Sequence, residues 1–401
     1  MRNAWKTLLS AQLGWALDAM DFLLFTFALR SIQAEFGLHD SVMGLLTSVA
    51  LIAGAAGGIL FGRLADRFGR VRAMTWSILL YSASTALLAT SSTLFELVLW
   101  RSILGLGMGG EWSSGSVLVS ETWPAEKRAK AMGLMQSGWA IGALTAAGLS
   151  ALLLERYGWR VLFLVGAFPA VVAFVIRRTV PEPEIWKRSD QATQHHGGGF
   201  GTMFRPPFLR RTILASAVAS AVLVAYWGLF SWLPTFLATP VEKGGAGLTI
   251  TKSARWMVLV QIGAFFGYVT FGWIADRVGR RPAFTLFMVA ATIVVPLYAM
   301  APSETVLTFV GPLVGFFGSG YFSVFGALFS ELYPTAIRGT AQGFCYNAGR
   351  LVSAAAPFAI GLAAATSGLG LAIGVNASFF AVAGLLVWLL PETRGTDLEE
   401  A

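Results

Sequence analysis

The chain has 401 residues, of which 56% are hydrophobic and only 12% are charged. An ordinary soluble domain carries roughly 25% charged residues, so water cannot be the main solvent of this chain. The formal net charge is +8, which raises the question of a nucleic-acid partner until the placement of the positive residues is known. The single cysteine, Cys345, excludes an intrachain disulfide and a thiolate metal cluster.

Apolar stretches long enough to cross a bilayer recur from one end of the chain to the other, and about 20 residues suffice for one helical crossing. The pattern predicts an all-α membrane protein with twelve transmembrane helices. The predicted spans are 10–30, 41–62, 73–91, 95–119, 130–153, 160–178, 211–237, 254–274, 283–301, 305–329, 340–364 and 369–390. His39 then falls in a loop and His195 and His196 in the central linker, which excludes a histidine metal site inside the membrane.

The positive residues are distributed unevenly between the predicted loops. If both termini lie on one side, that side receives 21 of the 29 lysines and arginines. Cytoplasmic loops carry the excess of positive residues, so the termini and the central loop are predicted to be cytoplasmic. The basic excess therefore reflects the topology of a multi-pass protein of the cytoplasmic (inner) membrane and not a nucleic-acid partner.

The two halves of the chain repeat each other at a constant offset of 210 residues. The run from Gly62 to Arg70 matches the run from Gly272 to Arg280. Two further matches keep the same register: Glu121, Pro124, Arg128 and Gly133 with Glu331, Pro334, Arg338 and Gly343, and Pro181-Glu182 with Pro391-Glu392. Three matches in one register indicate a true internal repeat.

The repeat predicts an N-terminal six-helix bundle over residues 1–180, a cytoplasmic linker over 181–210 and a C-terminal six-helix bundle over 211–401. Two halves in the same orientation are related by a pseudo-twofold axis along the membrane normal. A substrate site is then expected between the halves, near the midplane of the membrane.

Three motifs resemble the major facilitator superfamily over essentially the full length of the chain. They are the Gly-x-Leu-Ala-Asp-Arg-x-Gly-Arg run that begins at Gly62, its copy that begins at Gly272, and Arg101-x-x-x-Gly105-x-Gly107. Shorter segments are similar to the sialate and monocarboxylate (organic acid) proton symporters: Gly14-Trp15-x-x-Asp18-x-x-Asp21-Phe22, Gly109-Gly110-Glu111-Trp112 and Pro181-Glu182-x-Glu184-x-Trp186. Similar segments also occur in neighbouring organic-acid symporter families. The resemblance implies secondary transport by alternating access with protons as coupling ion and without a cofactor or metal.

Asp18 and Asp21 lie three residues apart in the first span, so both carboxylates share one helical face. A charge near the bilayer centre costs at least about 2.5–3.5 kcal/mol, so each needs a partner or a task. One of the two is predicted to carry the proton, and Asp21, which lies deeper in the span, is the preferred residue. The alternative is that one of them is a fixed partner of an arginine.

Arg101 and Glu111 complete the proton-coupling candidates. Ten residues separate them on the fourth span, about 15 Å along a helix, so they cannot pair with each other. The resemblance implies a role in proton transfer for Arg101, together with Asp18 or Asp21, and a structural ion pair is the alternative. For Glu111 the alternative is a hydrated cavity residue without a specific role.

Arg350 is the one charge well inside a span of the second half. A guanidinium offers a planar fork of donors that matches a carboxylate, so Arg350 is predicted to hold an anionic substrate. The alternative is a charge-balancing partner for Asp18 or Asp21 across the halves. The other predicted substrate contacts are Asn347, Tyr346, Gln136, Gln261, Tyr226, Trp227, Tyr321 and Phe325.

The cytoplasmic loops carry acids among the bases, whereas a topogenic signal would need only the bases. The acids suggest ion pairs that lock the cytoplasmic ends of the halves in one state and release them in the other, as the resemblance also implies. The predicted gating residues are Asp66, Arg70, Glu121, Arg128, Asp276, Arg280, Glu331 and Arg338.

An enzyme is not expected, since the sequence has no nucleophile–base constellation, nucleotide loop or metal-ligand cluster. The favoured function is proton-coupled uptake of a small organic anion by a monomer in contact with membrane lipid. Sugar porters remain an alternative because they share the run from Pro391 to Gly395. Export is a weaker alternative, since exporters carry Gly-Pro where this chain has Gly138-Trp139-Ala140-Ile141-Gly142. The remaining alternative is a receptor with the fold of a transporter.

Overall fold

A computed structural model describes residues 2–192, 199–248, 250–300 and 303–398 of the chain. His195 and His196, and the last residue of the predicted span 283–301, lie outside the described residues. Within them the regular structure is helical throughout, without a strand. This confirms the prediction of an all-α protein.

Seven α-helices form the first half of the chain. They are α1 (Arg2–Phe36), α2 (Asp40–Phe68), α3 (Arg70–Ala89), α4 (Leu94–Thr122), α5 (Arg128–Gln136), α6 (Gly138–Gly166) and α7 (Pro169–Thr179). The fifth crossing consists of α5 and the first part of α6. Gly158 then interrupts α6 with a φ of 77°, a left-handed value that glycine adopts without a steric penalty. The rest of α6 and α7 form the sixth crossing.

The second half repeats this plan after a connecting segment that contains α8 (Glu184–Ala192) and a short 3-10 helix (Phe200–Phe204). Its helices are α9 (Phe208–Phe230), α10 (Leu233–Ala238), α11 (Ile250–Val278), α12 (Arg280–Met300), α13 (Glu304–Ser319), α14 (Ser323–Leu332), α15 (Arg338–Ser353), α16 (Ala356–Ser367), α17 (Leu369–Asn376) and α18 (Ser378–Leu386). Gly368, between α16 and α17, has a φ of 81° and lies 210 residues after Gly158. The backbone breaks therefore follow the repeat.

Length and hydropathy alone identify nine helices of the described chain that could cross a membrane. The fold has twelve crossings, three more than this number of helices. One of the nine, Ala125–Ile176, contains two crossings joined at Gly158. The other two are α3 and α4, and α4 is less apolar because Arg101, Glu111 and several serines lie within it. Several helices exceed their predicted spans: α1 begins at Arg2 and not at residue 10.

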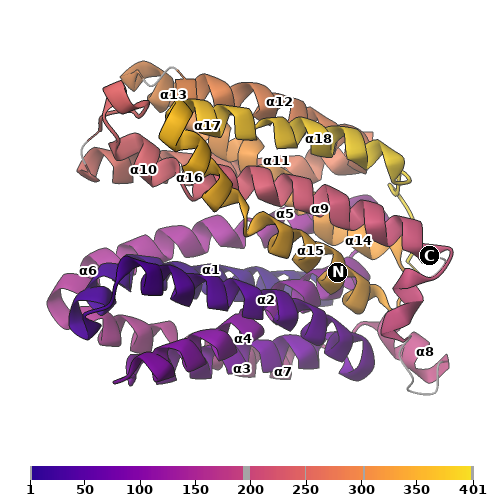
Figure 1. The fold of residues 1–401 in the computed structure, drawn as a ribbon. Coiled ribbons are helices and arrows are strands. Elements are labelled where there is room, and N and C mark those ends of the chain that lie inside the picture. The colour runs from indigo at the N-terminus through magenta and orange to yellow at the C-terminus, as the bar shows by residue number, and fades with distance from the viewer. Residues whose placement is uncertain (1, 193–198, 249, 301–302, 399–401) are drawn as a thin grey trace.

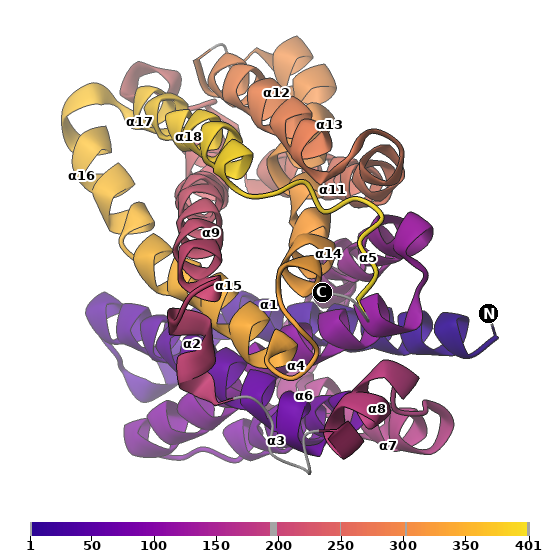
Figure 2. The same cartoon turned by 90° about the vertical axis from the view of Figure 1, so that its right-hand side faces the viewer.

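The two halves lie one above the other in Figure 1, with both termini at the same end of the molecule, here named the termini end. Across the seam between the halves, α2 packs against α15 and α5 packs against α11 (Figure 2). These two contacts are related by the repeat. At Gly62 a Cβ would overlap the carbonyl of Gly339, and at Gly272 it would overlap that of Ala129. Glycine at these positions lets the helix backbones approach closely.

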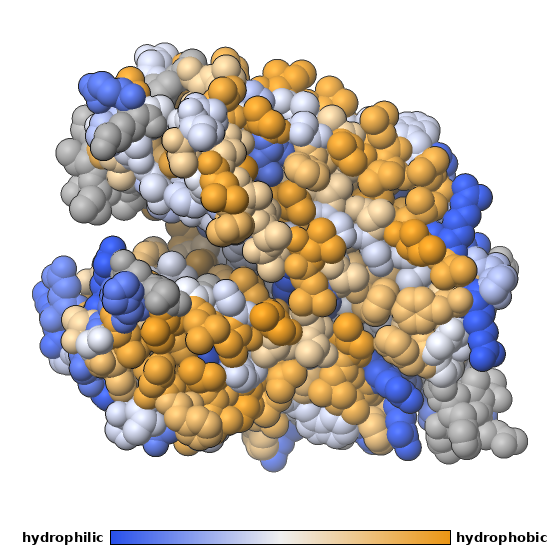
Figure 3. Space-filling model, in the orientation of Figure 1, coloured by the Kyte–Doolittle hydropathy of each residue, from blue (hydrophilic) through white to orange (hydrophobic). Residues whose placement is uncertain are grey.

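The outer surface is largely apolar, and charged residues gather at the two ends of the helices (Figure 3). This is the distribution expected of helices surrounded by lipid. Figure 3 also shows a deep hollow between the halves at the end opposite the termini, here named the far end. The halves are therefore apart at the far end and in contact at the termini end.

Candidate substrate site and gates

A small cavity of about 30 Å³ lies between the two halves, well below the roughly 300–1,000 Å³ typical of small-molecule sites. Seven of its ten lining residues are aromatic. The lining residues are Trp15, Gln136 and Trp139 from the first half and Leu223, Tyr226, Trp227, Tyr268, Phe322, Tyr346 and Arg350 from the second. An apolar wall with few polar groups suits an organic molecule that carries one charged group.

Arg350 is the only charged group among these lining residues. It lies near the C-terminal end of α15, with its guanidinium carbon 5.4 Å from the centre of the Tyr346 ring. Its Nη1 reaches the opposite half, 3.3 Å from the position that a Cβ on Gly54 would take. Arg350 makes no ion pair within the described part of the chain. It is hydrogen-bonded to the Tyr346 side chain, and its remaining donors face no carboxylate of the described chain, so a ligand can use them.

Aromatic contacts between the halves bound the cavity at both ends. Toward the termini end, Trp112 of α4 stacks on Tyr346 with 4.1 Å between ring centroids, and its Nε1 donates to Gln136 Oε1 at 3.1 Å. Toward the far end, Phe22 of α1 lies 6.2 Å from Trp227 of α9. The first pair of rings is closely stacked, whereas the second pair is tilted and further apart.

Asp18 and Asp21 are buried inside the first half, next to the cavity. The Oδ1 atom of each has no hydrogen-bond partner among the described residues, while Asp21 Oδ2 accepts a hydrogen bond from Thr85 Oγ1 at 2.8 Å. The charge of Arg350 acts on Asp18 from across the seam, and that of Arg101 acts on Asp21. In this state neither acid forms an ion pair with a described residue.

Arg101 and Glu111 lie on α4, where it faces α1. The guanidinium of Arg101 packs 3.7 Å from the centre of the Phe25 ring, and its Nε and Nη1 lack partners among the described residues. Both carboxylate oxygens of Glu111 are likewise unpaired within that part of the chain. Its Oε1 lies 2.5 Å from where a Cβ on Gly14 would be. All four proton-coupling candidates thus line one contact, between α1 and α4.

At the termini end the predicted gating residues form two related clusters, one in each half. In the first, Arg70 Nη1 pairs with Asp66 at 2.8 Å and Arg70 Nη2 with Glu121 at 2.8 Å. In the second, Arg280 pairs with Asp276 and with Glu331, both at 2.8 Å. The side chains in all four pairs are almost fully buried.

Further contacts join these clusters across the seam. Arg338 donates to Glu121 at 2.7 Å, and Arg128 donates to Glu331 at 2.8 Å. Asp66 accepts hydrogen bonds from the first amides of α15, Gly339 N at 2.9 Å and Thr340 N at 2.7 Å. In the same way, Asp276 binds the first amides of α5, Ala129 N at 3.1 Å and Lys130 N at 2.9 Å. A carboxylate at a helix N-terminus is favoured by free amides and by the helix dipole.

Two features of this end have no counterpart in the sequence predictions. The chain after α18 runs beneath both halves, and its carbonyls accept from the gating arginines: Thr396 O from Arg128 at 3.1 Å and Leu398 O from Arg338 at 3.1 Å. Glu182 binds the amides of Val71 and Arg72 at the start of α3, each at 3.1 Å. Burial raises the pKa of Glu182, although these amides act in the opposite direction.

Residues 13–251 and 243–400 match the Major Facilitator Superfamily. The chain belongs to this superfamily. It is 31% identical to a sialic acid transporter of Escherichia coli, with 95% of this chain and 93% of that protein covered. It is 30% identical to a cis,cis-muconate transport protein of Acinetobacter baylyi, with 100% and 97% covered. The structure of a proton:xylose symporter superposes with a TM-score of 0.82 at 21% identity, covering 100% of this chain and 98% of that one.

These findings make the protein a membrane transporter and not an enzyme. They also confirm the fold predicted for it, the major facilitator arrangement of two six-helix halves. The substrate, the coupling ion and the roles of single residues are not decided by this membership, because one fold carries many functions.

Within the superfamily fold, five of the nine predicted substrate contacts line the cavity: Arg350, Tyr346, Gln136, Tyr226 and Trp227. The other four do not line it. Asn347 is buried and donates to Gly343 O at 2.8 Å, Gln261 lies half-buried on α11, and Tyr321 and Phe325 are fully buried in aromatic packing of the second half. The lining residues that were not predicted are Trp15, Trp139, Leu223, Tyr268 and Phe322.

Replacing Asp66 with Asn is expected to weaken the contact between the halves at the termini end. The amide cannot accept from both Gly339 N and Thr340 N as the carboxylate does, and losing such a bond to a charged group costs about 1.5–3 kcal/mol. The probe is a cysteine that replaces Ser120 in a Cys345→Ala background, since Ser120 is buried against Gly326 O. In the Asp66→Asn variant this cysteine should react with maleimide at least about fivefold faster than in the protein that keeps Asp66. The control is Glu184→Gln, in an exposed ion pair with Lys187. Equal labelling rates would refute the gating role.

Proposed function

We propose that the protein takes up a small organic carboxylate across the cytoplasmic membrane by alternating access, driven by protons that enter with it. The observation that carries this proposal is Arg350, a guanidinium in an aromatic cavity at the seam that pairs with no acid of the described residues. A neutral substrate would not require a half-buried charge at this position, since hydroxyl groups are bound by neutral donors and acceptors.

The chemistry of the cavity favours an anion with a flat or apolar body. A carboxylate can accept two parallel hydrogen bonds from the Arg350 fork, while the rings of Trp15, Trp139 and Trp227 offer faces for the rest of the molecule. The relatives named for muconate and sialic acid support an acidic substrate. The predicted contacts Gln136, Tyr226 and Tyr346 supply further polar groups in the lining of the cavity.

We assign proton movement to the first half and anion binding to the second. Asp21 is the proposed carrier, with Asp18 between it and the charge of Arg350. A proton on either acid removes a negative charge near the anion site, which favours binding of the carboxylate. Arg101 and Glu111 on α4, whose side chains have polar atoms without a partner among the described residues, are the proposed accessory groups.

We assign the termini end to the cytoplasm, and the excess of positive residues in its loops supports this assignment. The clusters of Asp66, Arg70, Glu121 and their counterparts are then the cytoplasmic gate. The gate is closed in this structure, and the hollow at the far end faces the outside (Figure 3). This is the state in which a symporter loads its substrate and proton.

A sugar porter is the alternative function. The similarity of the fold to a proton:xylose symporter is compatible with it, as is the run from Pro391 to Gly395. Arg350 favours an anion over a sugar, because a fixed positive charge in the cavity attracts an anion.

The deciding experiment is a thermal-shift screen of the purified protein with carboxylates and sugars, followed by uptake into proteoliposomes. We expect a raised melting temperature for one class of carboxylates only. Its uptake should be concentrative when the outside is acidic and should cease when an ionophore dissipates the pH gradient. Stabilisation by sugars alone, or uptake that is indifferent to the pH gradient, would refute the proposal.

A further inference from the structure

Two positive side chains from opposite halves share one tryptophan at the seam. Trp273 lies near the termini end of α11, and the guanidinium carbon of Arg277, one turn further on, is 3.7 Å from the centre of its ring. The Nζ of Lys130, on α5 of the first half, is 5.2 Å from the centre of the same ring. The tryptophan thus brings together two cations that belong to different halves.

Neither cation has an acidic partner in the described structure. Their neighbours differ in this respect, since Arg128 and Arg280 are both paired with Glu331. Both cations lie beside the same ring, so an anion at this ring is attracted by both charges. Lys130 is half-buried and Arg277 exposed, so an anion can reach both.

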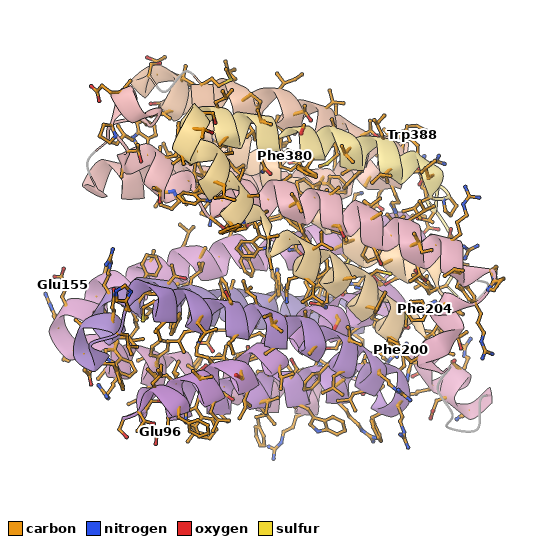
Figure 4. All side chains as sticks on the ribbon, in the orientation of Figure 1. Glu96, Glu155, Phe200, Phe204, Phe380 and Trp388 are labelled. Atoms are coloured by element: carbon orange, nitrogen blue, oxygen red, sulfur yellow. The ribbon has the colours of Figure 1, made fainter. Side chains whose placement is uncertain are left out.

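The position of the cluster suggests where that anion comes from. Trp273 is 49% exposed. Three more exposed tryptophans also lie toward the termini end of the molecule: Trp5, Trp76 and Trp388. Figure 4 shows Trp388 at this end, where Arg281 lies over its ring at 4.7 Å. Exposed tryptophans of a membrane protein mark the level of the lipid headgroups, so the cluster faces lipid phosphates.

Lys130 lies beside Trp273 only while the α5–α11 contact at the termini end is closed. Asp276 binds the amides of Ala129 and Lys130, and this contact holds the start of α5 against α11. When the halves separate at this seam, Lys130 moves away from Trp273 and the pair of cations is lost. A ligand that needs both cations therefore binds only while the gate is closed.

We propose that Lys130, Trp273 and Arg277 bind the phosphate headgroup of an anionic membrane lipid, which holds the two halves together in the state with the termini end closed. The lipid contributes the anion that the cluster lacks, and its acyl chains lie along the apolar outer face of α11. Binding is independent of which substrate the cavity takes.

The repeat provides a matched control. The positions 210 residues away from Trp273, Arg277 and Lys130 are occupied by Arg63, Arg67 and Thr340. The second seam thus has neither the tryptophan nor the lysine. Arg67 is exposed like Arg277 and lies 5.2 Å from the Phe68 ring, so Arg67→Gln removes an equivalent charge without touching the proposed site.

The test compares the melting temperature of the purified protein with dioctanoyl phosphatidylglycerol, dioctanoyl phosphatidylcholine and free glycerol phosphate. We expect stabilisation by phosphatidylglycerol alone. In Lys130→Gln/Arg277→Gln the shift should fall to the value for phosphatidylcholine, whereas Arg67→Gln should keep it. The single variant Lys130→Gln leaves all of α11 unchanged and should lose at least half of the melting-temperature shift caused by phosphatidylglycerol. It replaces the double variant in the test if the double variant does not fold.

An unchanged phosphatidylglycerol shift in the double variant would overturn the proposed site. An equal shift with glycerol phosphate would show a site for free phosphate esters and overturn the assignment to a lipid. Maleimide labelling of Ser120→Cys in the Cys345→Ala background tests whether the lipid favours the closed gate. Phosphatidylglycerol should slow this labelling when Lys130 and Arg277 are present and should have no effect in the double variant. Faster labelling with the lipid would refute stabilisation of the closed gate.

Discussion

Replacing Arg350 with Lys is expected to lower the affinity for the carboxylate substrate about 10- to 100-fold while the protein remains folded. Lysine keeps the charge but loses the planar fork, so at most one of two parallel hydrogen bonds survives. A hydrogen bond between charged groups contributes about 1.5–3 kcal/mol, and each 1.4 kcal/mol is tenfold in affinity. Titration calorimetry with the carboxylate identified in the screen measures the effect.

The same variant separates the two readings of Arg350. If the arginine only balances the charge of Asp18, lysine should serve as well, and affinity within about twofold of wild type would contradict the anion site. The control is Arg178→Lys, a surface arginine packed 4.1 Å from the Phe174 ring, which should leave affinity unchanged. A melting temperature equal to that of wild type excludes misfolding as the cause.

The fold was predictable because two independent signals in the sequence agree. Hydropathy locates most crossings, but it is weak for α4, where Arg101 and Glu111 lower the apolar content of a buried helix. The repeat restores such crossings, since each half must contain the same helices. The breaks at Gly158 and Gly368 fall in the gaps 154–159 and 365–368 between predicted spans.

The site was predictable to the extent that burying a charge is costly. That cost identified Asp18, Asp21 and Arg350 without any structure, and all three lie at or beside the cavity. Aromatic residues carry no such signal. Trp139 lines the cavity and Tyr321 does not, yet both are apolar rings in apolar helices, because lipid, core and cavity wall all accept the same side chains.

The gate shows a second limit of sequence reasoning. The acids and bases of each half were recognised as a cluster, but which acid pairs with which base depends on the packing of α2 on α15 and α5 on α11. Arg338 binds Glu121 and Arg128 binds Glu331, so each arginine uses the acid of the other half. No spacing in the chain encodes that exchange, because it arises only when the two halves meet.

Replacing Asp21 with Asn is expected to abolish accumulation of substrate against a gradient while exchange of substrate across the membrane continues. Asparagine has nearly the shape of aspartic acid and can still accept the hydrogen bond from Thr85, but it cannot take up or release a proton. Without a carrier the transporter can only equilibrate its substrate, so the accumulation ratio should fall to about one. Proteoliposomes with an inward pH gradient measure accumulation, and counterflow measures exchange.

Asp18→Asn is the matched variant, because Asp18 is the neighbouring buried acid on the same face of α1 and is acted on by Arg350. If Asp21 is the carrier, Asp18→Asn should alter substrate affinity more than coupling, since it changes the charge balance around the anion site. Alkalinisation of the outer medium during uptake distinguishes the two acids directly. Should Asp21→Asn still alkalinise the medium and accumulate substrate while Asp18→Asn does neither, the carrier is Asp18, and the proton site lies next to Arg350 and not one turn away from it.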